Sequence, residues 1–207
     1  MIGLIGKKIG MTQVFDEKGV ITPVTVIQID ENTVVAERSK EKHGYDAVVL
    51  GAVEMKEKRA TKPYKGQFPE GTGPKRIHKE FRDFDAEYTV GGSLGVELFG
   101  DLEYVDVHGL SKGKGYQGVM KRHGFGGGRK THGSKFHRGL GSTGMAAWPS
   151  KVQKGSKMPG RMGTDKVIVQ NLRVVRVDTD KKVILVKGSV PGPRGSSVIV
   201  REAKKKY

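Results

Sequence analysis

The sequence predicts a mainly β protein whose body is a small barrel or sandwich, interrupted by an α+β insertion and by a long irregular basic loop. Short runs rich in β-branched residues, separated by tight-turn sequences, occur near both ends of the chain. Between them lies a mixed-charge stretch with Pro and Gly punctuation at 54–92 and a glycine-rich stretch without acidic residues at 111–164. The whole chain has 207 residues, which is enough for one domain of ordinary size with insertions.

The first part of the body is expected at residues 1–53, with five strands and turn residues between them. Asp16 to Gly19 and Asp30 to Asn32 have turn chemistry, as has His43-Gly44. Pro23 lacks a backbone donor, so its strand should begin there or lie at a sheet edge. The predicted strands are 4–9, 12–15, 20–29, 33–38 and 46–53.

The α+β insertion is expected at residues 54–92, with one or two short helices, of which 76–83 is the best candidate. Body strands then return in 93–110 and again in 165–207. Those strands are predicted at 93–99, 104–107, 166–177, 182–187 and 196–201. The basic segment, residues 111–164, is therefore inserted between strands and anchored at both ends.

The basic segment carries twelve Lys or Arg, fourteen Gly and no Asp or Glu, in a chain of net charge +16. The rest of the chain has 26 basic against 22 acidic residues. A segment that is so rich in glycine and positive charge cannot bury enough apolar surface to offset the entropy lost when it becomes ordered. We therefore expect it to become ordered against a polyanion. Glycine runs supply no apolar helix face for a membrane, so nucleic acid is favoured.

RNA is the more natural partner than DNA, because no recognition helix, zinc finger or homeodomain pattern is present. Cations interleaved with aromatic side chains, on a backbone that glycine lets approach phosphates, suit folded or single-stranded RNA. Such contacts position the chain without reading base sequence. The predicted RNA-binding residues are Lys112, Lys114, Lys121, Arg122, Arg129, Lys130, His132, Lys135, His137, Arg138, Lys151, Lys154, Lys157 and Arg161.

The least charged part of the segment is a loop tip that holds the chain's only tryptophan. Trp148 is either a plug that docks on the protein's own body or a probe inserted into the partner, and composition does not separate these alternatives. Proline after it restricts its backbone to extended conformations. The tip comprises Met145, Ala146, Ala147, Trp148 and Pro149.

An enzyme alternative rests on Gly113, Gly115 and Gly118, which match a dinucleotide-binding G-x-G-x-x-G before an expected helix at 116–123. Against it, the flanking strands are expected to be antiparallel, and the next acidic residue, Asp165, is far beyond the usual distance of about 20 residues. The glycine turn still suits a phosphate, including one in RNA. A DNA-compacting protein or RNA chaperone is a third alternative.

No catalytic apparatus, metal site or cofactor is expected. His123, His132 and His137 have no Cys, Asp or Glu within the segment to complete a metal shell. The chain has no cysteine and no apolar run near the roughly 18 residues of a membrane span, which predicts a cytoplasmic protein with neither membrane nor small-molecule partner.

The residues also resemble a known family, that of the third large-subunit ribosomal protein in its bacterial form, over essentially the whole chain. The opening 6–12, GKKIGMT, is similar to the family's start, and 132–134, 137–138, 157–163 and 186–192 also fit. The most specific signature comprises Phe99, Asp106, Gly109, Ser111, Gly113, Lys114, Gly115, Gly118 and Arg122.

This resemblance implies a closed Greek-key β-barrel of the translation-protein type, seated on the large ribosomal subunit among neighbouring ribosomal proteins. It implies an extension that threads through ribosomal RNA towards the peptidyl transferase centre, early binding during subunit assembly, contact with the 3′-terminal part of the large RNA, and no catalysis. Many bacterial members carry a glutamine at the tip that can be methylated. Here the tip reads Met145 to Pro149, closer to archaeal and eukaryotic members, so the resemblance does not carry a methylated glutamine over to this chain.

Overall fold

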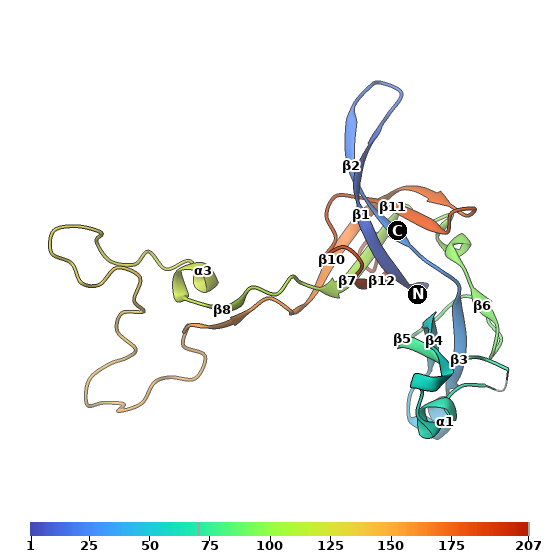
Figure 1. The fold of residues 1–207 in the computed structure, drawn as a ribbon, viewed down its shortest axis with the longest axis horizontal. Helices are drawn as coiled ribbons and strands as arrows, with labels where there is room; N and C mark the ends of the chain where they lie inside the picture. The colour runs from blue at the N-terminus through green and yellow to red at the C-terminus, as the bar shows by residue number, and fades with distance from the viewer. Residues whose placement is uncertain (70, 207) are drawn as a thin grey trace. The chain divides into compact units, whose positions relative to one another are not determined.

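The computed structural model describes residues 1–69 and 71–206, which cluster into two compact units (Figure 1). The body comprises Met1–Leu110 and the chain from Lys166 onward, and the extension comprises Ser111–Asp165. Each unit is treated separately below.

The body is built on a closed six-stranded barrel in which every pairing is antiparallel, confirming the predicted β-barrel. The strands expected at 4–9 and 12–15 form one long strand, because a bulge between Lys8 and Gly10 bends the chain without ending its pairing. In barrel order, the strands are β1 (Gly3–Phe15), β12 (Ser197–Glu202), β7 (Tyr104–Leu110), β10 (Lys166–Asp178), β11 (Val183–Lys187) and β2 (Ile21–Gln28).

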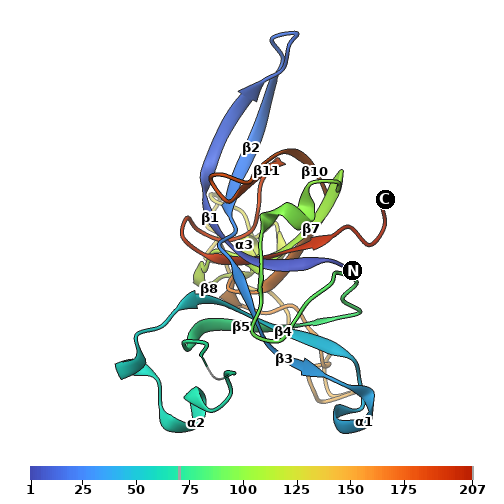
Figure 2. The same ribbon diagram turned by 90° about the vertical axis from the view of Figure 1, so that its right-hand side faces the viewer.

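A second sheet has the order β5 (Lys75–Arg82), β4 (Ala47–Glu54), β3 (Asn32–Arg38) and β6 (Ser93–Leu94), seen below the barrel in Figure 2. Strand β3 and all of β4 except its last residue fall in the range 1–53 that the sequence assigned to the barrel, yet both strands pair in this sheet. Their turn chemistry predicts a hairpin but not which sheet the hairpin joins.

The helix predicted at 76–83 is wrong, because this segment is strand β5, paired along β4. Its alternating side chains put Phe81, 2% exposed, into the core, and β4 offers a free edge. The strand expected at 93–99 is wrong beyond Leu94, since the chain turns there into a 3₁₀ helix, η2 (Val96–Phe99), which buries both end residues. The remaining short helices of the body are α1 (Lys40–His43), η1 (Glu57–Arg59) and α2 (Lys62–Lys65).

One apolar core joins the barrel and the second sheet. Its buried side chains include Leu4 and Ile27 from the barrel and Leu50 and Phe81 from the sheet. The ring of Phe81 lies so close to β1 that a Cβ on Gly3 would be 2.7 Å from it. The two sheets therefore form one folded body.

Buried polar side chains complete the backbone hydrogen bonding where strand pairing stops. Ile5 lies beyond the last β1–β2 pair, and the fully buried Asn32 replaces a strand there: its Oδ1 accepts from Ile5 N at 2.9 Å and its Nδ2 donates to Ile5 O at 3.0 Å. Asp106 likewise accepts from Asn171 N at 2.8 Å, inside the irregularity of β10. These residues satisfy buried backbone groups that would otherwise be costly to desolvate.

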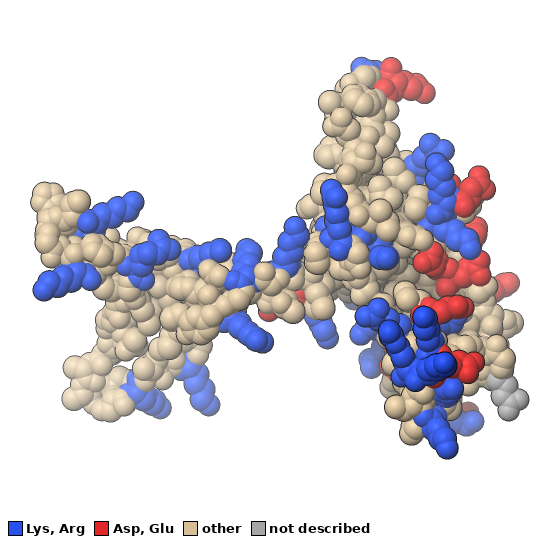
Figure 3. Space-filling view, viewed as in Figure 1, with Lys and Arg blue, Asp and Glu red and all other residues tan. Residues whose placement is uncertain are grey.

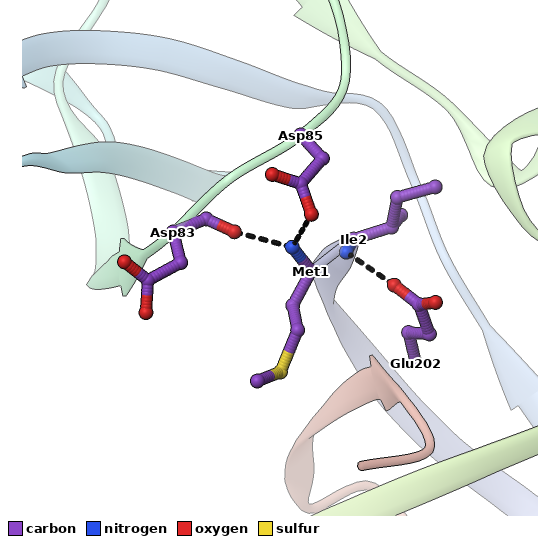
Figure 4. Close-up of polar contacts among 5 residues, drawn as sticks. All are labelled: Met1, Ile2, Asp83, Asp85 and Glu202. Carbon is purple, nitrogen blue, oxygen red and sulfur yellow. Dashed lines mark hydrogen bonds and ion pairs between the residues drawn. The ribbon is translucent and has the colours of Figure 1, made fainter. Parts of the chain in front are cut away.

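The first residues of the chain bind across the body (Figure 4). The amino group of Met1 donates to the Asp83 carbonyl and pairs with the Asp85 carboxylate, while Ile2 N donates to Glu202 Oε2 at 3.2 Å. Residues that follow β5 and residues that end β12 thus hold the start of β1.

Candidate RNA interface

The neck of the extension is a short two-stranded ladder between β8 (Gly115–Gln117) and β9 (Gly160–Met162). Ser111 N donates to Asp165 O and Lys114 N to Met162 O, both at 2.9 Å. Gly163 has φ +79°, and a Cβ there would lie 2.1 Å from the Lys112 carbonyl oxygen. The ladder fixes where both ends of the loop start, and its close approach requires glycine at this position.

Helix α3 (Val119–His123) starts three residues later than predicted, because Tyr116 belongs to β8 and Gly118 is the N-cap. Arg122 Nη1 donates to the Met158 carbonyl at 2.7 Å, and His123 Nε2 lies 3.1 Å from the same oxygen. These contacts join helix α3 to the chain just before strand β9. Arg122 therefore has a structural role, whereas the sequence assigned it only to RNA.

Histidine 137 organises the next loop. Gly128 N donates to the His137 carbonyl at 3.0 Å, and His137 Nδ1 lies 2.9 Å from the Arg129 carbonyl. A Cβ on Gly128 would lie 1.8 Å from the Phe136 carbonyl oxygen, so the two sides of this loop approach each other this closely only because glycine is present. No local sequence signal reveals these roles, because the partners are separated by up to 36 positions.

The remaining predicted RNA-binding residues are presented to solvent. All of them except the half-buried Arg122 are exposed, and no ion pair among the described residues involves one. Figure 3 shows lysine and arginine side chains spread along the extension. The positive charge of this unit is thus uncompensated within the described protein and free to meet phosphates.

The loop tip is apolar and open. Met145 is 80% and Trp148 is 84% exposed, and the Trp148–Pro149 peptide bond is cis. Beside the tip lies a hollow of about 520 Å³ with a mixed lining. Its apolar side chains include Phe125 and Met158, its polar ones include Thr143 and Gln153, and Lys151 and Lys157 add positive charge. An exposed indole near cations is an arrangement suited to stacking on a base.

The dinucleotide-binding interpretation is wrong. The strand before the glycines, β7, is antiparallel to both its neighbours, and Gly115 lies inside the β8–β9 ladder instead of a strand-to-helix turn. Helix α3 has only five residues. The dinucleotide-binding fingerprint requires a parallel βαβ unit, and these glycines do not lie in one.

Two further observations bear on chemistry. Within the described ranges, no group of three or more His, Cys, Asp or Glu is placed to hold a metal, and no helix has the length and apolarity needed to cross a membrane. In the body, burial lowers the pKa of His108, and the charge of Arg201 acts in the same direction.

Comparison with known proteins identifies the family. Residues 76–183, more than half of the chain, match the model of a family described as ribosomal protein L3. The chain belongs to the ribosomal protein L3 family. Its relatives of the L3 family include the large ribosomal subunit protein uL3 of Treponema denticola, 58% identical over 206 residues that cover 100% of this chain and 99% of the relative. The uL3 protein of Borrelia hermsii is 52% identical, with 99% of both chains covered, and that of Borreliella burgdorferi is 47% identical, with 99% and 100% covered.

Membership of the L3 family makes this protein a structural constituent of the ribosome and not an enzyme.

Proposed function

We propose that the extension binds large-subunit ribosomal RNA, that this binding supports early assembly of the subunit, and that the loop tip reaches towards the peptidyl transferase centre. The body would then seat the protein on the large subunit of a cytoplasmic ribosome, beside neighbouring ribosomal proteins. One observation carries the proposal: residues 111–164 hold twelve Lys and Arg without a single acidic residue, and all of these cations except Arg122 are exposed on a loop that glycine lets approach phosphates closely.

The lysine and arginine residues of the extension divide into two groups with different roles. Arg122 holds the base of the extension through Met158, whereas solvent-facing side chains such as Lys130, Lys135 and Arg138 have no acidic partner among the described residues. The second group is the one proposed to neutralise phosphates deep inside folded RNA, where like charges of RNA would otherwise repel.

The tip is proposed to make a contact of another kind. Residues 145–149 carry no charge, while Arg138 and Lys151 flank them. Cations on the arms would set the path of the extension through RNA, and the exposed indole of Trp148 would stack at its end.

Salt dependence tests this proposal directly. If six to ten phosphates are engaged, affinity for a large-subunit RNA fragment should fall about 10³- to 10⁵-fold between 50 and 200 mM salt. A flat response contradicts phosphate binding. If duplex DNA or unrelated RNA binds equally tightly, the protein does not recognise ribosomal RNA specifically. It would then act as a general nucleic-acid compacting protein or RNA chaperone.

A further inference from the structure

The hairpin of β1 and β2 extends beyond the barrel as a ribbon, visible in Figures 1 and 2. Pairing of β1 with β12 ends at Lys7, and pairing of β2 with β11 ends at Val24, but β1 and β2 stay paired as far as Phe15 and Ile21. The outer part of the hairpin, residues 10–23, which we call the ribbon, therefore has hydrogen-bonded strands on neither outer edge over most of its length.

One face of the ribbon is apolar and exposed. Phe15 is directly opposite Ile21, and Gln13 is opposite Pro23, so these side chains and that of Met11 point to the same side. Phe15 is 59%, Ile21 53% and Met11 48% exposed. Large apolar side chains gathered on one exposed face are typical of an interaction surface.

The end of the ribbon is held in a defined conformation. Asp16 Oδ1 accepts from Lys18 N at 3.0 Å and from Val20 N at 2.7 Å, and Asp16 N donates to Val20 O at 3.1 Å. These bonds fix the strand register and so fix which side chains share the face. The face is preorganised in the free protein, although a two-stranded ribbon alone in water is at best marginally stable.

The chemistry of the ribbon opposes that of the extension. No charged residue occurs in 9–15 or in 19–29, although the chain has a net charge of +16. RNA binding needs cations near phosphates, but the turn of the ribbon carries Asp16 and Glu17 against the single Lys18 and so has no net positive charge. A partner matched to this face is uncharged and apolar, which is the surface of a protein and not of RNA.

We propose that the Met11, Phe15 and Ile21 face of the ribbon docks on a neighbouring protein of the ribosomal particle that presents an uncharged apolar surface. This rests on the protein being assembled into that particle, but not on RNA contact by the extension. Docking covers the apolar face and shields the open strand edges, which otherwise invite unspecific pairing.

Photocrosslinking in assembled large subunits tests the proposal. Phe15 is replaced by p-benzoylphenylalanine in one version of the full chain and Tyr116, 73% exposed in the extension, in another. Position 15 is expected to crosslink to a different ribosomal protein, whose crosslinked peptide is uncharged and apolar, and position 116 to RNA. An RNA adduct, an adduct to a second copy of this chain, or no adduct at position 15 overturns the proposal, whereas loss of the RNA adduct at 116 alone contradicts the proposed function instead.

A substitution pair gives an independent measurement. Phe15→Asp with Ile21→Asp should lower the occupancy of the crosslinked neighbour in reconstituted particles at least about fivefold, as expected for the loss of central interface side chains. Val90→Asp, at an apolar residue 53% exposed elsewhere in the body, is the matched control and should leave that occupancy unchanged. Unchanged occupancy in the double variant, or an equal loss in the control, overturns the proposal.

Discussion

The body and the extension of this protein show two different ways of ordering a chain. In the body, apolar side chains from two sheets are buried together, with polar residues such as Asn32 completing backbone bonds. In the extension, Val119 is the one fully buried hydrophobic residue described, and order comes from backbone bonds across close glycine contacts, as at Gly128 and Gly163. The comparison teaches that the body is stable through its own core, whereas the extension is ordered by backbone contacts and leaves its charge exposed.

The largest effect should come from truncating an aromatic residue in the body. Phe81→Ala removes a side chain 2% exposed that joins β5 to β1, and should lower the free energy of unfolding by about 3–5 kcal/mol. Phe136→Ala, at a residue 45% exposed in the extension, should leave the unfolding of the body almost unchanged. Chemical denaturation of both variants checks this, and similar losses would show that the extension shares the stability of the body.

Removing charge from the extension should affect RNA affinity and not the free energy of unfolding. Replacing Lys130, Lys135 and Arg138 by Gln should leave unfolding unchanged but reduce the slope of log affinity against log salt by about 2.7, roughly 0.9 for each lost phosphate contact. The matched control replaces the exposed body residues Lys58, Lys62 and Lys79 by Gln, and should keep the slope. Binding titrations with large-subunit RNA at several salt concentrations measure both, and equal slopes in the two triple variants would contradict a division of labour between the units.

The smallest effect is expected for Trp148→Ala. Because the indole is 84% exposed, its loss should change the free energy of unfolding by less than about 0.5 kcal/mol, as at other exposed sites. A clear drop in the melting temperature of the RNA-free protein would instead identify Trp148 as a plug for the protein's own core.

Several parts of this molecule followed from local sequence. The acid-free run of 111–164 predicted a segment that cannot bury much apolar surface. The structure leaves all of its Lys and Arg except Arg122 exposed, because charge that cannot be neutralised nearby stays in water. Short β-branched runs predicted the strands of the barrel, since alternation of side chains is a local property. Arg122 and His137 were recognised only as cations or stacking groups, because the carbonyls that they contact lie elsewhere in the chain.

The sequence by itself determined the class of fold and the position of the basic segment between strands, and it predicts a polyanionic partner for that segment. All of these inferences depend on composition and short-range pattern. Tertiary structure alone decided that 75–82 is a strand, that β3 and β4 leave the barrel for a second sheet, and that Asn32 completes the pairing of β1. The physical reason is that a strand edge is chosen by whichever distant segment can satisfy its hydrogen bonds while burying its apolar face. That choice is made between segments far apart in the chain, so no local pattern contains it.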